Sequence, residues 1–139
     1  MRILAIDYGT KRIGIAISDP TGTLASPLET IPAYPFERFV DRLKQIILEK
    51  DVSLILVGMP RSLNGQYGES ANRVLDFVNV LKTAVTVPVK TWDERLTTVQ
   101  AQRSMHDAGG KTKDFRQKLD SMAAAVLLQS YLDANPGQN

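Results

Sequence analysis

The sequence predicts an α/β fold, a mixed five-stranded sheet flanked by helices on both faces. Two observations predict it. The first third of the chain carries three strand-like segments in succession, which favours an antiparallel meander. The remainder alternates between apolar strand-like runs and segments with helical periodicity, which is typical of parallel strands joined by helical crossovers.

The three leading strands are expected over residues 2–7, 12–18 and 23–31. The first is an apolar run that ends in Asp7 and is followed by a turn. In the second, isoleucines alternate with small residues, which include Gly14 and Ala16, and this period of two is typical of a strand. The first two strands therefore form a β-hairpin. The third is weaker because Pro27 interrupts it.

The later elements are expected to be strands at 52–57 and 85–91 and helices at 36–50, 69–82, 97–107 and 114–133. The first helix has apolar residues three and four apart, which form one stripe along it. The strand at 52–57 is continuously apolar, so we expect it to be buried on both faces. Pro88 indicates an edge strand or a strand end, and Thr97-x-x-Gln100 has the capping-box pattern that begins a helix.

The composition bounds the class of protein. A chain of 139 residues with 43% hydrophobic residues fits a single domain over 1–139, with 134–139 expected to be a flexible tail. The absence of cysteine excludes disulfides and thiolate chemistry, and with no signal peptide or membrane span evident we expect a cytoplasmic protein. The net charge of +2 permits nucleic-acid binding without requiring it.

Acidic side chains at strand ends are the first candidates for chemistry. Asp7 ends a buried strand, where a carboxylate is held rigidly and still reaches solvent, as a metal ligand requires. A plain turn aspartate is the alternative. Asp93 and Glu94 follow the strand at 85–91, and because neighbours point to opposite faces, only one of them faces the same site as Asp7. A surface ion pair with Arg95 is the alternative for this pair.

Asp120 is the third acidic candidate. Helical spacing puts it on the apolar face of the last helix, which comprises Ala123, Ala124, Leu127, Leu128 and Tyr131. A carboxylate on such a face points toward the core or its mouth and needs a cation or hydrogen-bond donors. The alternative is an N-cap aspartate that starts a shorter helix at Ser121.

These acids together predict a site for a hard cation. Oxygen ligands favour Mg²⁺ or Mn²⁺. A zinc site of the usual kind is hard to build from a chain without cysteine and with one histidine. That histidine, His106, lies beside Asp107 near a helix end, where we expect it to be solvated rather than a general base.

Basic residues lie next to the candidate acids and the strand ends, and four of them crowd the segment before Asp120. These basic residues are Lys11, Arg12, Arg61, Arg95, Lys111, Lys113, Arg116 and Lys118. Together they would form the rim of one cleft and hold phosphates, although solvated loops are the alternative for each. Tyr67 and Trp92 are candidates for stacking on bases or for packing.

Other enzyme classes find less support. The chain has no Gly-x-Ser-x-Gly elbow for a serine nucleophile and no Gly-x-x-x-x-Gly-Lys-Ser/Thr phosphate loop. The stretch Asp7-Tyr8-Gly9-Thr10 is similar to the phosphate loop of actin-like ATPases and sugar kinases. Those proteins need a second lobe to close over the nucleotide, which this chain is too short to supply.

Four motifs occur in one order: Asp7-x-Gly9-Thr10-Lys11-x-x-Gly14-x-Ala16, Val57-Gly58-x-Pro60, Asp93-Glu94-Arg95-Leu96-Thr97-Thr98 and Asp120-x-x-Ala123-Ala124. With them the chain strongly resembles the bacterial YqgF/RuvX family over nearly its whole length. Members of that family are described as Holliday junction resolvases and as nucleases that process the 5′ end of the precursor of 16S ribosomal RNA. The resemblance implies a ribonuclease H-like fold. It also implies an acidic triad of Asp7, Glu94 and Asp120, with phosphate handling by Gly9, Thr10 and Arg95.

The activity we expect is hydrolysis of phosphodiester bonds in structured nucleic acid by a metal-dependent endonuclease. Two ions about 3.5–4 Å apart would activate water and stabilise the leaving oxygen. A non-catalytic RNA-binding ribosome assembly factor and an actin-like nucleotide-binding ATPase fragment are the alternatives. The sequence leaves open the choice of RNA or DNA, of monomer or homodimer, and whether Asp93 joins the site.

Overall fold

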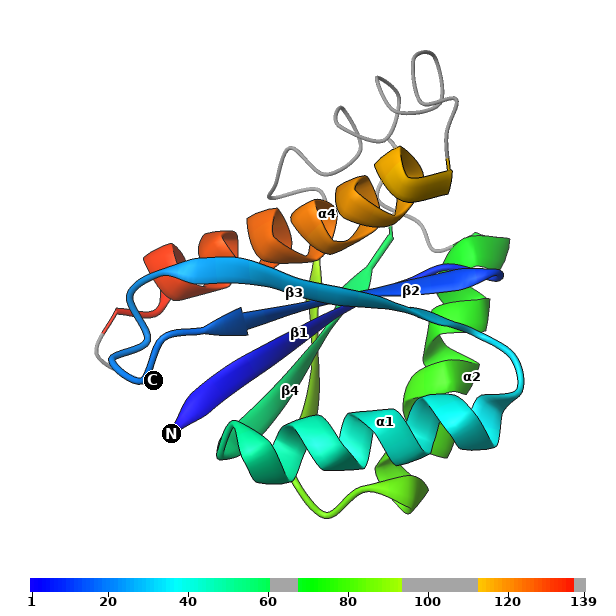
Figure 1. Ribbon diagram of the computed structural model, residues 1–139, viewed down its shortest axis with the longest axis horizontal. Coiled ribbons are helices and arrows are strands. Elements are labelled where there is room, and N and C mark those ends of the chain that lie inside the picture. Colours follow the sequence, from blue (N-terminus) through cyan, green and yellow to red (C-terminus); the bar gives the residue numbers. More distant parts are fainter. Residues whose placement is uncertain (61–67, 94–112, 137–139) are drawn as a thin grey trace.

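The structure, a computed structural model, describes residues 1–60, 68–93 and 113–136. Its strands and helices are shown in Figure 1. They are β1 (Arg2–Tyr8), β2 (Arg12–Ser18), β3 (Ala25–Pro32), α1 (Phe36–Glu49), β4 (Val52–Met59), α2 (Glu69–Ala84), β5 (Val89–Asp93) and α4 (Lys113–Ala134). The helix expected at 97–107 lies outside the described residues.

The strands form one mixed sheet in the order β3-β2-β1-β4-β5. β1 pairs antiparallel with β2, and β2 pairs antiparallel with β3, so the predicted meander is confirmed. β4 pairs parallel with both β1 and β5. Because β1, β4 and β5 run in the same direction, their carboxyl ends meet at one edge of the sheet.

Helices cover both faces of the sheet, as predicted: α4 packs on one face, and α1 and α2 lie on the other (Figure 1). The α1/α2 side holds the larger apolar core, which includes Leu4, Ile6 and Phe39. The α4 side holds a smaller core built from short side chains of the sheet, among them Ala5 and Ala16, against the leucines of α4. Short side chains on this face let α4 lie close to the sheet.

β2 has its predicted bounds, and the other four strands differ from theirs by one to four residues at an end. Prolines bear on β3 and β5. β3 keeps Pro27, because the pairing with β2 shifts there: Ile15 pairs with Glu29, whereas Ala16 pairs with Pro27. A bulge on an edge strand needs no N–H from proline, so the strand continues through it. β5 begins only after Pro88, whose carbonyl oxygen accepts a hydrogen bond from the Ile55 N–H at 2.9 Å.

Candidate active site

Asp7 is a buried carboxylate near the carboxyl end of β1, with only 3% of its surface exposed. Side chains alternate along a strand, and Ile6 belongs to the core on the α1/α2 side while Ala5 belongs to the core on the α4 side. Asp7 therefore faces α4. Its partner on β2 is Gly14, which carries no side chain into the space between this part of the sheet and the helix.

The backbone of α4 rests directly on Gly14. A Cβ atom added to Gly14 would overlap the carbonyl oxygen of Asp120 and would lie 3.0 Å from the backbone nitrogen of Ser121. Because Gly14 is paired with Asp7, this contact brings Asp120 to the same face and the same end of the sheet as Asp7. The two acids are separated by more than one hundred positions in the sequence, and the close approach of α4 to β2 brings them together.

The predicted inward face of α4 is confirmed, since Ala123, Ala124, Leu127, Leu128 and Tyr131 are all buried. The alternative in which Asp120 caps a shorter helix is wrong. α4 begins at Lys113, so Asp120 lies in the helix interior, where the backbone N–H groups that an N-cap would accept are already used within the helix.

Arg12 holds the Asp120 carboxylate. Its Nε donates a hydrogen bond to Oδ2 of Asp120 at 2.8 Å, across 108 positions of sequence. Both side chains are about a quarter exposed, so water screens this ion pair only in part. The sequence placed Arg12 among the phosphate-binding residues and contained no signal for this pairing, because the contact depends on where α4 crosses β2.

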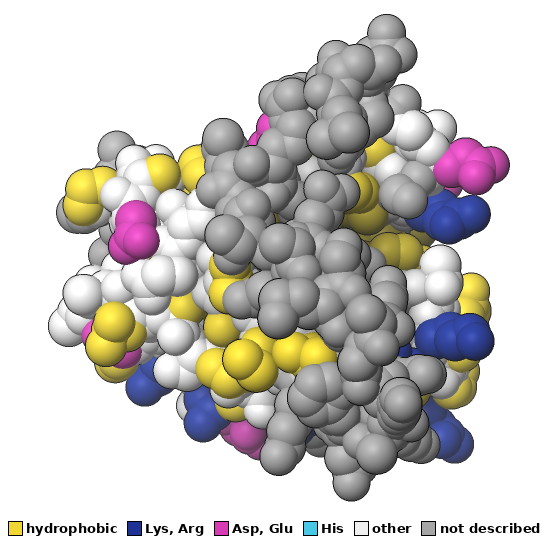
Figure 2. Space-filling view, turned by 90° about the horizontal axis from the view of Figure 1, so that it is seen from above, with side chains coloured by type: hydrophobic (Ala, Val, Ile, Leu, Met, Phe, Trp, Pro, Cys, Tyr) yellow, Lys and Arg dark blue, Asp and Glu magenta, His cyan; other side chains and the backbone are white. Residues whose placement is uncertain are grey.

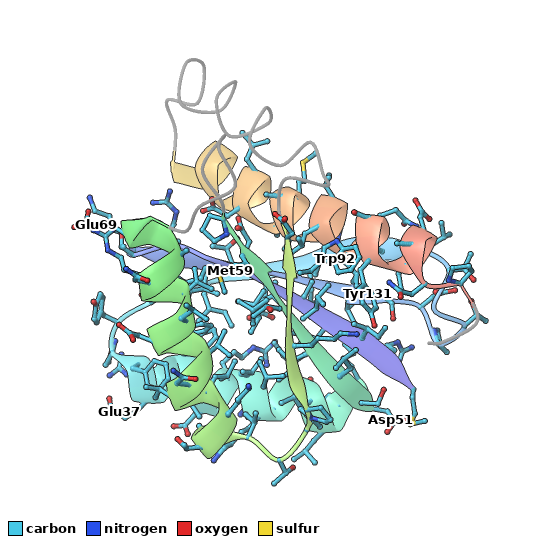
Figure 3. The ribbon with its side chains drawn as sticks, turned by 180° about the vertical axis from the view of Figure 1, so that it is seen from behind. Glu37, Asp51, Met59, Glu69, Trp92 and Tyr131 are labelled. Carbon is cyan, nitrogen blue, oxygen red and sulfur yellow. The ribbon has the colours of Figure 1, made fainter. Side chains whose placement is uncertain are left out.

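Of the adjacent acids Asp93 and Glu94, the structure describes only Asp93. Trp92 faces α4, where its ring meets that of Tyr131 edge-on at 5.1 Å between centroids and its Nε1 donates to Ser130 at 3.2 Å (Figure 3). Asp93, the next residue of β5, therefore points to the opposite face from Asp7. Glu94 lies outside the described residues. Trp92 is a packing residue here, which resolves the choice between stacking on bases and packing.

The turn after β1 is tight and partly exposed. A Cβ on Gly9 would overlap the carbonyl oxygen of Arg12, so the turn needs glycine at this position. Thr10 and Lys11 are exposed on it. Seen from the α4 side, Lys and Arg side chains gather at the right-hand end of the molecule (Figure 2), which is the end where β1 passes into β2 in Figure 1.

The other predicted basic residues are described in part or not at all. The backbones of Lys113, Arg116 and Lys118 belong to the first turns of α4. Arg61, Tyr67, Arg95, His106 and Lys111 lie outside the described residues. Within residues 1–60, 68–93 and 113–136 no group of three acidic or histidine side chains is close enough to hold a metal. In the same ranges no helix has the length and apolar character that crossing a bilayer requires.

The family model named RuvX, described as "Holliday junction resolvase", matches residues 1–134. The chain belongs to the RuvX family. The family prediction is therefore confirmed, and the predicted enzyme class, a nuclease, agrees with the family's description.

Relatives of the RuvX chain match it along almost their whole length. A protein of Desulforamulus reducens named "Putative pre-16S rRNA nuclease" is 46% identical over 134 residues, which cover 96% of this chain and 98% of that protein. A protein of the same name from Thermoanaerobacter pseudethanolicus is 44% identical over 135 residues, with 96% and 97% covered.

Solved structures with the same fold include two resolvases. One is T. thermophilus RuvC in complex with a Holliday junction substrate, at a TM-score of 0.57 and 17% identity over 99% of this chain and 97% of that one. The other is the fowlpox virus Holliday junction resolvase, at a TM-score of 0.53 and 16% identity over 97% and 100%. At such low identity these likenesses concern the fold alone, and they confirm the ribonuclease H-like class predicted for RuvX.

Proposed function

We propose that this RuvX chain is a metal-dependent endonuclease that hydrolyses phosphodiester bonds in structured nucleic acid, with precursor 16S ribosomal RNA as its substrate. One observation carries the proposal: the backbone of α4 at Asp120 rests on Gly14, the residue paired with Asp7, so both acids lie on one face of the sheet at the edge where the parallel strands end. Ligand sites of open α/β sheets lie at this edge. The family membership supports the reaction class.

The relatives favour precursor rRNA over a Holliday junction as the substrate. Full-length relatives at 46% and 44% identity carry the name of a pre-16S rRNA nuclease. The junction-bound RuvC structure is only 17% identical. Trimming of a precursor needs a single active site, whereas junction resolution needs two coordinated cuts and hence a dimer, so the proposed substrate is compatible with a monomer.

The donor set fits a hard divalent cation, Mg²⁺ or Mn²⁺. Carboxylate oxygens are the ligands these ions prefer, and Asp7 is a buried carboxylate at this edge of the sheet. We assign Asp7, Asp120 and Glu94 to hold the ion. A divalent ion in such a site supplies Lewis acidity and charge stabilisation at the phosphate.

The chain's own basic residues position the ligands and the substrate. Arg12 orients Asp120 through the 2.8 Å hydrogen bond, which fixes the rotamer of the carboxylate. The exposed turn at Gly9, Thr10 and Lys11 follows directly after β1 and offers a positive charge to a phosphate near Asp7. We assign the remaining nucleic-acid contacts to Arg61, Arg95, Lys111, Lys113, Arg116 and Lys118.

The substitution Asp7→Asn tests this function. It keeps the size of the side chain and removes its charge, so we expect cleavage to fall by at least about 100-fold while binding of the substrate stays within about threefold. Asp51→Asn is the matched control. This substitution makes the same chemical change in the exposed turn before β4, at the opposite edge of the sheet (Figure 3). The positive φ of Asp51, 55°, also suits asparagine.

The assay measures Mg²⁺- and Mn²⁺-stimulated cleavage of a precursor 16S rRNA fragment and of a synthetic four-way DNA junction, with circular dichroism to verify folding. If the Asp7→Asn variant cleaved as fast as the wild-type protein, the assignment of Asp7 would be refuted. Binding of the RNA without any cleavage by the wild-type protein would point to a non-catalytic assembly factor. Cleavage of the junction alone would leave the reaction class intact and overturn the proposed substrate.

A further inference from the structure

A cavity of about 420 Å³ opens on the face of the sheet that lies away from Asp120. It is bounded by the ends of β1 and β2, by the segment that leads into α1, and by α2. Figure 3 shows these elements converging on the side of the molecule where Glu69 and Glu37 are labelled, at the starts of α2 and α1. This volume lies in the range of pockets that bind small ligands.

Aromatic rings form the inner wall of the cavity. The ring of Phe77 lies 4.6 Å from that of Tyr8 and meets Phe36 edge-on at 6.3 Å, both between centroids. Tyr34 also lines the cavity, yet 75% of its surface is exposed. An exposed tyrosine beside an aromatic wall presents a flat face on which a planar ligand stacks at small entropic cost.

Two charged residues of opposite sign complete the lining. Arg73 and Asp76, both on α2, line it, and Nη2 of Arg73 also lies 3.9 Å from the carboxylate of Glu69. A guanidinium donates hydrogen bonds to carbonyl and ring-nitrogen acceptors of bases, and a carboxylate accepts them from exocyclic amino groups. A planar apolar body with donors and acceptors on its edge, which is the chemistry of a nucleobase, matches this combination of walls and polar groups.

The cavity is next to the proposed active site along the chain but on the other face of the sheet. Tyr8, in its wall, is the residue after Asp7, and the basic turn at Gly9–Lys11 separates the two faces. A nucleic-acid strand with a phosphate near Asp7 and a base in the cavity would have to pass this turn, on which Lys11 is exposed. Phosphates are attracted along such a path by charge.

We infer that the cavity binds one unpaired nucleobase of the substrate strand, stacked on Tyr34. This inference rests on the proposed function for the nature of the strand. It adds a preference for a single-stranded segment beside the structured part of the substrate, because a base inside a duplex cannot leave its stack without loss of pairing energy.

The test compares binding of two single-stranded decamers of equal length and charge, one of RNA and one of abasic nucleotides, by fluorescence anisotropy in buffer free of divalent cations. We expect the wild-type protein to bind the RNA decamer more tightly. Tyr34→Ala should weaken RNA binding by about 5- to 100-fold and leave abasic binding unchanged, because it removes stacking alone. Tyr34→Phe keeps the ring and should retain wild-type affinity.

Leu48→Ala is the control. Leu48 lies on α1, is 84% exposed and does not line the cavity, so its replacement should change neither affinity. Equal affinity of the wild-type protein for the two decamers, or no effect of Tyr34→Ala, would overturn the inference and would favour a protein partner for this groove. Cleavage by the wild-type protein is measured in parallel. If the wild-type protein did not cleave, the proposed function would be refuted. If it cleaved but bound both decamers equally, only the base pocket would be refuted.

Discussion

The substitution Gly14→Ala tests the contact on which the candidate site depends. Gly14 lies in β2, opposite Asp7, with the backbone of α4 resting on it. Its backbone is that of a strand, which alanine adopts without strain. Any effect of the added methyl group must therefore come from the overlap with the carbonyl oxygen of Asp120.

The size of the effect follows from two opposing terms. Alanine in a compatible backbone stabilises a protein by about 0.4–1 kcal/mol through the unfolded chain. Overpacking against a backbone group that cannot rotate away costs about 1–3 kcal/mol. The net destabilisation at the midpoints of these ranges is about 1.3 kcal/mol, which lowers the Tm of a chain of 139 residues by about 3–6 °C.

We expect a larger relative effect on the cleavage rate than on the free energy of unfolding, because the overlap pushes the segment of α4 that carries Asp120 away from Asp7. A displacement of about 1 Å in a catalytic group costs about 100-fold in rate. Urea unfolding and the metal-stimulated cleavage assay measure the two effects separately.

Gly68→Ala is the matched control, since nothing lies within 4 Å of a Cβ added there. Its entropic gain is offset by the weaker N-cap that alanine provides for α2, so we expect a change of about 0.5 kcal/mol or less. If Gly14→Ala were as stable and as active as the wild-type protein, α4 would not rest on β2 at this point. The argument for the convergence of Asp7 and Asp120 would then fail.

Two further predictions concern charged groups. A double-mutant cycle of Arg12→Gln and Asp120→Asn should give a coupling of about 0.5–2 kcal/mol in the free energy of unfolding, reduced in 1 M salt because the pair is partly exposed; a coupling of zero would contradict the ion pair. Hydrogen bonds from the Thr21 hydroxyl and the Leu24 and Thr23 N–H groups lower the pKa of Asp19 from 3.8 to about 2. This carboxylate therefore stabilises the fold above pH 3.8, and its contribution is lost as the pH falls toward 2. An NMR titration of Asp19 with a midpoint near 3.8 would contradict this.

Local patterns predicted most of the elements. The alternation of isoleucines with small residues in β2 and the apolar spacing of α1 come from backbone geometry, which repeats every two or 3.6 residues whatever the rest of the chain does. The same geometry predicted Asp7 at a strand end and Asp120 on the apolar face of its helix. The two prolines acted differently: β3 continues through Pro27 and β5 begins only after Pro88, because the pairing partner decides whether a missing N–H matters.

What the sequence determined by itself is the set of elements, the family of the chain and the two acids Asp7 and Asp120 as candidates. Only the tertiary structure decided that Arg12 pairs with Asp120 instead of facing solvent, that Trp92 packs on Tyr131, and that aromatic rings from β1, α1 and α2 surround a cavity. The physical reason is distance along the chain. Periodicity depends on neighbouring residues, whereas these contacts depend on where α4 and α2 settle on the sheet, which many weak packing interactions determine together.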